Sequence, residues 1–300
     1  MRLYTLRELH TWCSIPYDAL ENHQDRKIPF RLVKDSGEMG KIMAEELVDL
    51  IESNNRAGWE TRAIIPCGPS CWYRPFTDLV NKRGVSLKSL VVFHMDDCLD
   101  WQCRFLSENH PYNFRAVMER VFYNPVHDEL CVPEGQRVWL RPDTIDEVRE
   151  RIYAAPLDIT YGGWGQDGHI AYNQARRDPF SQLTIDEVRN SSIRVQMNSI
   201  DTIITLAQRS FGVAYQFVPP MSVTLGVKEC LSARKVRLFS DTGTWKQTAL
   251  RVALFGPVTP EYPMTLLQEH PDALLTATVD TARHPISEHP EWDLGIEEQV

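Results

Sequence analysis

The segment from Tyr161 to Gln174 carries the residue types and spacing that most strongly indicate chemistry in this chain. It reads YGGWGQDGHIAYNQ, with four glycines in seven positions. Glycine at this density permits close backbone approach and positive φ angles. Asp167 stands two residues before His169, and a carboxylate at that spacing can orient an imidazole for proton transfer. The segment therefore predicts an acid–base site that contains Asp167 and His169.

Two adjacent carboxylates, Asp96 and Asp97, form a second candidate site because they directly follow the apolar run LVVFHM. An acid at the end of a buried strand is costly unless it is paired or used, so one of the two is a candidate general base. A structural alternative is that one of these carboxylates caps the next helix or pairs with Arg104.

A third candidate is the segment Pro66-Cys67-Gly68-Pro69-Ser70, which joins an apolar run to a helical stretch. Amide groups at the start of a helix can hold an anion, so the segment is a candidate anion-binding loop. Glycine and proline after a strand also form ordinary turns, and this segment alone does not separate the two readings.

The elements that must position these segments follow from hydrophobic periodicity. Apolar runs predict buried strands at residues 61–66, 90–95, 157–162, 236–240 and 273–278. Helix-period stretches lie at residues 38–53, 77–82, 112–122, 145–154, 199–211 and 244–254. The alternation predicts an α/β fold with a doubly wound, mostly parallel sheet and helices on both faces. Ligands bind such sheets beyond the carboxyl ends of the strands, where the three candidate segments are expected.

Length and composition indicate one folded domain, since 300 residues with 43% hydrophobic and 24% charged content can bury a sizeable core. We expect an amino-terminal extension over residues 1–29, the main domain over residues 30–283 and a carboxyl-terminal tail over residues 284–300. The formal net charge of -9 disfavours a nucleic-acid-binding protein. Charges interrupt the first 30 residues, so we expect no signal peptide, no membrane partner and a cytoplasmic location.

The cysteines raise the question of a metal site. They number seven and are scattered through the chain, which predicts free thiols. A zinc alternative would combine Cys67, Cys71, Cys98 and Cys103 with His94, but the CxxxC and CxxxxC spacings differ from the paired CxxC pattern of structural zinc sites. We therefore predict neither a metal nor another cofactor.

These segments resemble those of the glucosamine-6-phosphate deaminase family. GGWGQDGHIAYNQ is similar to that family's GGxGxDGHIAFNE signature, and VVFHMDDCLD is similar to its strand ending in MDEY. LSENHPYNFRAVMERVFY, VPPMSVTLGV and HPDALLTATVD extend the resemblance over residues 30–282. The resemblance implies a fold of the deaminase, ribose-5-phosphate isomerase and CoA-transferase kind. It also implies an isomerase or deaminase of hexosamine phosphates.

The resemblance further implies residue roles. Asp96 would move a proton between C2 and C1 of the open-chain sugar, and His169, oriented by Asp167, would assist ring opening, with Gln174 as the fourth member of the catalytic set. The implied and adjacent substrate-binding positions are Cys67, Gly68, Pro69, Ser70, Asp97, Gly165, Gly168, Arg209 and Lys246. This proton transfer needs a well-placed carboxylate and no metal.

Four departures from the family pattern fall at this implied site. Gln174 replaces the glutamate of the signature and cannot take a proton. Pro69 replaces the second glycine of the phosphate loop, which removes an amide donor. Cys98 replaces the tyrosine of MDEY. Where the family has a substrate-contacting arginine, this chain has Thr-Leu at 205–206, and Arg209 is the nearest basic residue downstream. The departures predict a relative with a shifted sugar substrate.

Two other functions remain open on the sequence. 6-Phosphogluconolactonases share the Gly-Asp-Gly-His core, although the continuation IAYN is closer to the deaminases. A non-catalytic sugar-phosphate sensor would fit the changes at Gln174 and Pro69. The expected partner is a small phosphorylated sugar in each case. The identity of the sugar, the release of ammonia and the oligomeric state, a homo-oligomer included, stay open.

Overall fold

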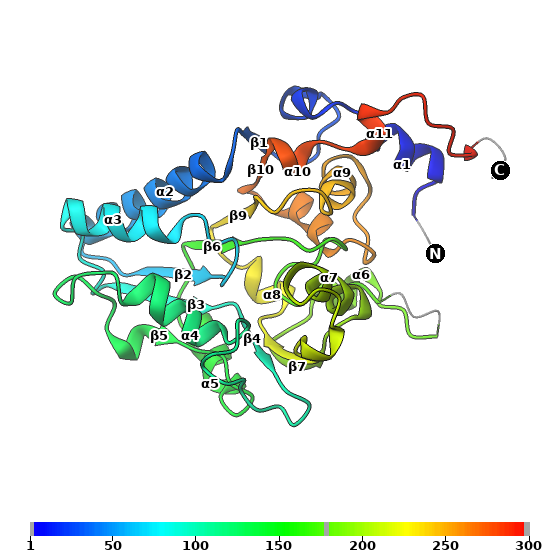
Figure 1. Ribbon diagram of the computed structural model, residues 1–300. Helices are drawn as coiled ribbons and strands as arrows, with labels where there is room; N and C mark the ends of the chain where they lie inside the picture. The colour runs from blue at the N-terminus through cyan, green and yellow to red at the C-terminus, as the bar shows by residue number, and fades with distance from the viewer. Residues whose placement is uncertain (1–2, 177–179, 297–300) are drawn as a thin grey trace.

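The computed structural model describes residues 3–176 and 180–296, and its centre is a parallel sheet (Figure 1). Within these residues the strand order is β1-β10-β9-β6-β2-β3-β5, and every neighbouring pair is parallel. The strands are β1 (Phe30–Val33), β2 (Thr61–Ile65), β3 (Leu90–His94), β5 (Arg137–Val138), β6 (Ile159–Gly162), β9 (Lys235–Ser240) and β10 (Ala273–Thr278). The five predicted strands are all present, and the predicted α/β class is confirmed.

The sheet is covered on both faces, as predicted from the alternation of strands and helices. Side chains of a strand point alternately to its two faces. Accordingly, Ile64 of β2 and Phe93 of β3 belong to one buried cluster, whereas Ala63 and Val92 belong to another. The first cluster includes side chains of α5 and α9, and the second includes side chains of α2 and α3.

The helices agree with the predicted stretches in position and differ mainly at their ends. Their bounds are α1 (Leu6–Cys13), α2 (Ser36–Ala57), α3 (Tyr73–Arg83), α4 (Phe114–Met118), α5 (Ile145–Tyr153), α6 (Ile185–Arg189), α7 (Ile200–Ser210), α8 (Val227–Cys230), α9 (Gln247–Phe255), α10 (Val279–Ala282) and α11 (Pro285–Glu288). Short helical turns are η1 (Tyr17–Asn22), η2 (Glu119–Tyr123), η3 (Glu134–Gln136), η4 (Tyr215–Phe217) and η5 (Pro263–Glu269). The stretch predicted at 112–122 is α4 followed by the π-helical turn η2. No helix in the described ranges combines the length and apolarity that a bilayer span requires.

A second sheet, which the sequence analysis did not predict, stands beside the first. Its strands β4 (Asp96–Leu99), β8 (Met221–Thr224) and β7 (Arg194–Met197) are antiparallel and pair in the order β4-β8-β7. The segment with Asp96 and Asp97 is therefore itself a strand, which the apolar run before it did not predict. The three strands are short and come from distant parts of the chain, so local periodicity does not reveal their pairing.

The first and last helices, α1 and α11, lie side by side on the α9 side of the molecule (Figure 1). Leu20 and Ile28 of the predicted extension are buried in the same cluster as Leu250 of α9. Lys27 also donates a hydrogen bond from its ammonium group to the carbonyl oxygen of Gly256, at 2.7 Å. The extension thus packs on the main domain, and the division at residues 29 and 283 stays a prediction.

Candidate active site

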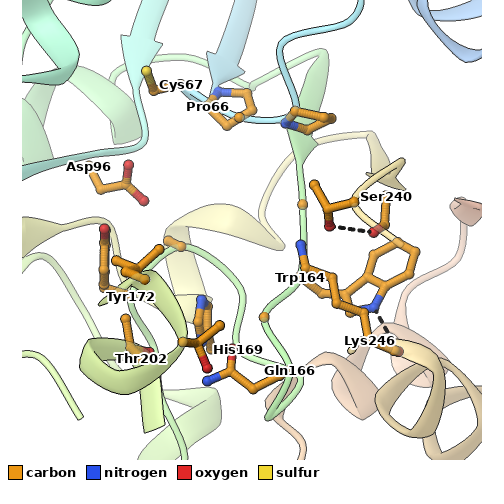
Figure 2. Close-up of a pocket in the computed structure, with 18 of the residues that line it drawn as sticks. Pro66, Cys67, Asp96, Trp164, Gln166, His169, Tyr172, Thr202, Ser240 and Lys246 are labelled. Carbon is orange, nitrogen blue, oxygen red and sulfur yellow. Dashed lines mark hydrogen bonds between the residues drawn. The ribbon is translucent and has the colours of Figure 1, made fainter. Parts of the chain in front are cut away.

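A pocket of about 210 Å³ opens beyond the carboxyl ends of β2, β3, β6 and β9 (Figure 2). It brings together all three segments that the sequence analysis selected, together with α7 and the start of α9. The predicted site residues that line it are Cys67, Gly68, Pro69, Asp96, Gly165, His169, Arg209 and Lys246. Those that lie outside the lining are Ser70, Asp97, Asp167, Gly168 and Gln174.

Asp96 enters the pocket at the point where the chain passes from one sheet to the other. The backbone N–H of Met95 donates to the carbonyl oxygen of Ile65 at 3.1 Å, and the Met95 carbonyl oxygen accepts from the N–H of Leu225 at 2.9 Å. The next residue, Asp96, keeps part of its surface open to the pocket. Burial, and secondly the neighbouring Asp97, raises the pKa of Asp96 to about 8. A carboxyl group with such a pKa can both take and return a proton near neutral pH.

Asp97 has a structural role and lies outside the pocket lining, so the geometry gives no support to its prediction as a substrate-binding residue. Its side chain is 5% exposed, and Oδ1 accepts hydrogen bonds from the backbone N–H groups of Cys98 at 2.8 Å and Phe114 at 3.0 Å. Phe114 is the first residue of α4, so the structural alternative of a helix-capping acid applies to Asp97. Arg104 pairs with Asp100 instead, with Nε 2.8 Å from Oδ2.

His169 and Asp167 form a hydrogen-bonded pair at the opposite wall from Asp96. His169 Nδ1 lies 2.6 Å from Oδ1 of the fully buried Asp167, which leaves Nε2 as the ring nitrogen for a ligand. Burial alone would raise the pKa of Asp167, but the charge and hydrogen bonds of His169 outweigh it, and the pKa is lowered. A Cβ atom on Gly165 would lie 2.1 Å from Cε1 of His169, so the ring fits only against glycine. Gly168 has a φ of 70° and forms the turn.

Gln174 lies outside the pocket lining, and its side-chain hydrogen bonds go to α7, so its place in the predicted catalytic set stays a prediction. Its Nε2 donates to Oγ1 of Thr202 at 2.6 Å, and its Oε1 accepts from the backbone N–H of Ser199 at 2.6 Å. Ser199 is the N-cap of α7, and the pocket residue Arg209 lies near the end of that helix. Gln174 therefore stabilises the first turn of α7, a helix that lines the pocket.

Two cations mark the end of the pocket that is formed by α7 and the start of α9. Lys246 and Arg209 both line the pocket, and the guanidinium group of Arg209 lies 4.2 Å from the ring centroid of Trp245. Burial, and secondly the charge of Arg209, lowers the pKa of Lys246 to about 8. Thr205 also lines the pocket, so Arg209 reaches it from one helical turn further along α7. Two adjacent positive charges suit a dianionic group such as phosphate.

The predicted anion loop contributes fewer donors than its sequence suggested. Ser70 is exposed and lies outside the pocket lining, and Pro69 has no N–H group. Burial, and secondly the charge of Asp96, raises the pKa of the Cys67 thiol, which stays protonated. Across the described ranges, no group of three His, Cys, Asp or Glu side chains is arranged to hold a metal ion. All seven cysteines are free thiols.

Several lining residues were missed by the sequence analysis. They are mainly aromatic or hydroxyl-bearing and include Trp164, Gln166, Tyr172, Thr202, Ser240, Thr242 and Trp245. Figure 2 shows Tyr172 on the Asp96 side of the pocket and Trp164 on the Lys246 side, where the indole N–H lies 3.4 Å from the Lys246 carbonyl oxygen. Tyr172 lies within the glycine-rich segment, but the direction of its side chain could not be read from that segment.

Comparison with known proteins adds sequence and fold relatives. No protein-family model matches the chain. It is 30% identical over 234 residues to human glucosamine-6-phosphate deaminase 1, covering 73% of this chain and 75% of that protein. It is also 30% identical over 217 residues to the glucosamine-6-phosphate deaminase of Parabacteroides distasonis, covering 70% of this chain and 74% of that protein.

Solved structures show the same fold at lower identity. A monomeric glucosamine-6-phosphate deaminase superposes with a TM-score of 0.68 at 19% identity, covering 84% of this chain and 98% of that one. The 6-phosphogluconolactonase of Trypanosoma cruzi superposes with a TM-score of 0.59 at 15% identity, covering 85% of this chain and 96% of that one.

Proposed function

The chain belongs to the glucosamine-6-phosphate deaminase family, and we propose on that basis that it converts an amino-sugar phosphate, with glucosamine-6-phosphate as the first candidate, into a ketose phosphate and ammonia. The observation that supports the proposal most is the layout of the pocket. Asp96 and the Asp167–His169 pair lie on opposite sides of one cavity, and a cationic end with Lys246 and Arg209 adjoins them.

The cationic end would receive the phosphate. Lys246 and Arg209 supply charge, and the hydroxyl groups of Ser240 and Thr242, whose oxygens lie 3.4 Å apart, supply neutral donors at the same end. A bound dianion would hold Lys246 in its charged form, because an opposite charge favours ionisation. Anchoring at this end would leave C1 and C2 of the sugar between Asp96 and His169.

Ring opening and proton transfer would then follow on the two walls. His169, held by Asp167, would carry the proton of the C1 hydroxyl group toward the ring oxygen, so that the ring bond breaks and the C1 aldehyde forms. Asp96 would take the proton from C2 while the C1 oxygen gains a proton from the substrate's ammonium group, which gives an enaminol. Asp96 would then return its proton to C1, which leaves a hydroxyl group at C1 and an iminium ion at C2. Water would add to C2, the C–N bond would break, and ammonia would leave with the ketone formed.

The decisive experiment is a paired assay on purified protein. Ammonia release from glucosamine-6-phosphate and exchange of the C2 proton in deuterated water are followed for the wild-type chain and for Asp96→Asn. Both signals in the wild type, lost in the variant, would support the deaminase. Exchange without ammonia would indicate an isomerase of another sugar phosphate. Stabilisation by the sugar phosphate without either signal would indicate the sensor alternative and overturn the proposal.

Two further predictions remain attached to this proposal. We expect the reaction to take place in the cytoplasm. The protein can be a monomer or a homo-oligomer, and the molar mass in solution would distinguish the two. The lactonase alternative has fold support from the solved structures, but nothing in the geometry of the pocket favours it over the deaminase.

A further inference from the structure

Two departures from the family pattern meet in the structure. Tyr172 stands where the signature GHIAFNE has phenylalanine, and Cys98 stands where MDEY has tyrosine. The Tyr172 hydroxyl oxygen and the Cys98 sulfur are 3.2 Å apart, and both residues are buried. The family pattern carries a tyrosine on the strand, whereas here a tyrosine of the glycine-rich segment lines the pocket and contacts the cysteine that occupies the strand position.

The backbone holds Tyr172 firmly next to the strand of Asp96. The Tyr172 N–H donates to Oγ1 of Thr224 at 3.0 Å, and Thr224 is the cross-strand partner of Asp96 in the second sheet. The preceding residue, Ala171, has a φ of 53°, a left-handed conformation that is strained for a residue other than glycine. Backbone strain of this kind is often found at functional sites.

The hydrogen bond between Tyr172 and Cys98 can run in either direction, and with the thiol as donor the Tyr172 hydroxyl proton is free for the pocket. Cys98 follows Asp96 by two residues on β4, so both side chains point to the same face of the strand. Burial raises the pKa of the Cys98 thiol well above its usual value, and the thiol keeps a proton that it can donate to the Tyr172 oxygen. Figure 2 shows the Tyr172 hydroxyl directed toward the wall that carries the Asp96 carboxylate.

We propose that Tyr172 contacts the reacting end of the sugar and that Cys98 is its positioning residue. The inference rests on the proposed function. When Asp96 takes the C2 proton, the electrons of the C2–H bond form a C1–C2 double bond, and those of the C1 carbonyl move onto its oxygen. The Tyr172 hydroxyl donates a hydrogen bond to this oxygen as negative charge develops there. Donors placed where charge develops accelerate such steps.

The test compares Tyr172→Phe, Cys98→Ala and Cys98→Ser with the wild-type chain on glucosamine-6-phosphate. Tyr172→Phe should lower kcat about 10- to 100-fold, as expected for a hydrogen bond to a charged group, with KM changed less than about threefold. Cys98→Ala should lower kcat by a smaller factor, and Cys98→Ser should restore part of that loss because its hydroxyl group can donate to Tyr172. The double variant Tyr172→Phe, Cys98→Ala should match Tyr172→Phe alone.

A matched control separates this role from a structural one. Tyr153 donates its hydroxyl to Oε1 of Glu229 at 3.1 Å outside the pocket, so Tyr153→Phe removes a tyrosine hydrogen bond remote from the site and should leave kcat unchanged. Melting temperatures are measured for every variant. A Tyr172→Phe protein with wild-type kcat, or effects of Tyr172 and Cys98 that simply add, would overturn the inference alone. An inactive wild-type chain would overturn the proposed function and this inference with it.

Discussion

His169 Nδ1 and Asp167 Oδ1 are 2.6 Å apart, and the Asp167 side chain is sealed from solvent behind the ring. The second oxygen of that carboxylate, Oδ2, is buried without a hydrogen-bond partner among the described residues. A buried carboxylate held in this way fixes the ring orientation and stabilises positive charge on the imidazole when it takes a proton. The pair is thus arranged as a proton carrier on the pocket wall.

Replacing Asp167 by asparagine should slow the reaction through His169. The amide keeps the shape but loses the charge that supports a protonated ring, so we expect kcat/KM to fall about 10- to 100-fold. Steady-state ammonia release measures this effect, and circular dichroism checks that the fold is kept. An Asp167→Asn protein with unchanged kcat/KM would contradict the role of the pair.

The pH dependence of kcat/KM should report Asp96 and Lys246. Asp96, whose pKa burial raises to about 8, must lose its proton to act as a base, so activity should rise as the pH approaches 8. Lys246, whose pKa burial lowers to about 8, loses its charge above that pH, so phosphate binding should then weaken. A profile of kcat/KM from about pH 6 to about pH 10 measures both limbs.

Lys246→Arg is the matched variant for this profile. Arginine stays protonated over the whole range, so the fall on the alkaline side should disappear while the rise on the acid side remains. If kcat/KM of Lys246→Arg still fell on the alkaline side, the fall would belong to the titration of another group.

Asp96 should also lower the stability of the fold. The pKa of its carboxyl group rises from 3.8 to about 8 on folding, chiefly through burial. The folded protein therefore keeps a proton that the unfolded chain releases, and the free energy of unfolding falls as the pH rises from about 4 to about 8. Asp96→Asn should remove this penalty and unfold at a higher temperature at pH 8, by about 2–4 °C for each kcal/mol. Calorimetry at pH 5 and at pH 8 tests this, and an equal shift at both pH values would speak against it.

Gln174 should act through α7 and not through His169. Gln174→Ala loses the hydrogen bonds to Thr202 and Ser199, so we expect a lower melting temperature and a higher KM, because α7 carries Arg209. Gln174→Glu can still accept from the Ser199 N–H, and the Thr202 hydroxyl, which accepts from Gln174, can donate to the glutamate instead, so this variant should stay closer to the wild type. If Gln174→Ala changed kcat alone, with melting temperature and KM kept, Gln174 would belong in the catalytic set after all.

Much of the main sheet and the core of the site could be read from local patterns. The buried runs at Thr61–Ile65, Leu90–His94 and Ala273–Thr278 are continuous apolar strands, and such runs are detectable without any knowledge of their partners. The Asp167–His169 pair was likewise predictable, because its two residues are separated by one glycine and depend on Gly165 nearby in the chain.

The sequence alone thus determined the local elements, the glycine-dependent turn and the family to which the chain is similar. Only the tertiary structure decided where side chains point once distant strands pair. In the folded chain β4 pairs with β8, and β8 pairs with β7. Asp97 accepts a hydrogen bond from the first residue of α4, and Gln174 donates one to Thr202 of α7. Tyr172 contacts Cys98, which is 74 residues away in the chain. The physical reason is that each of these hydrogen bonds joins groups on separate elements, whose relative position is set by packing of the whole core.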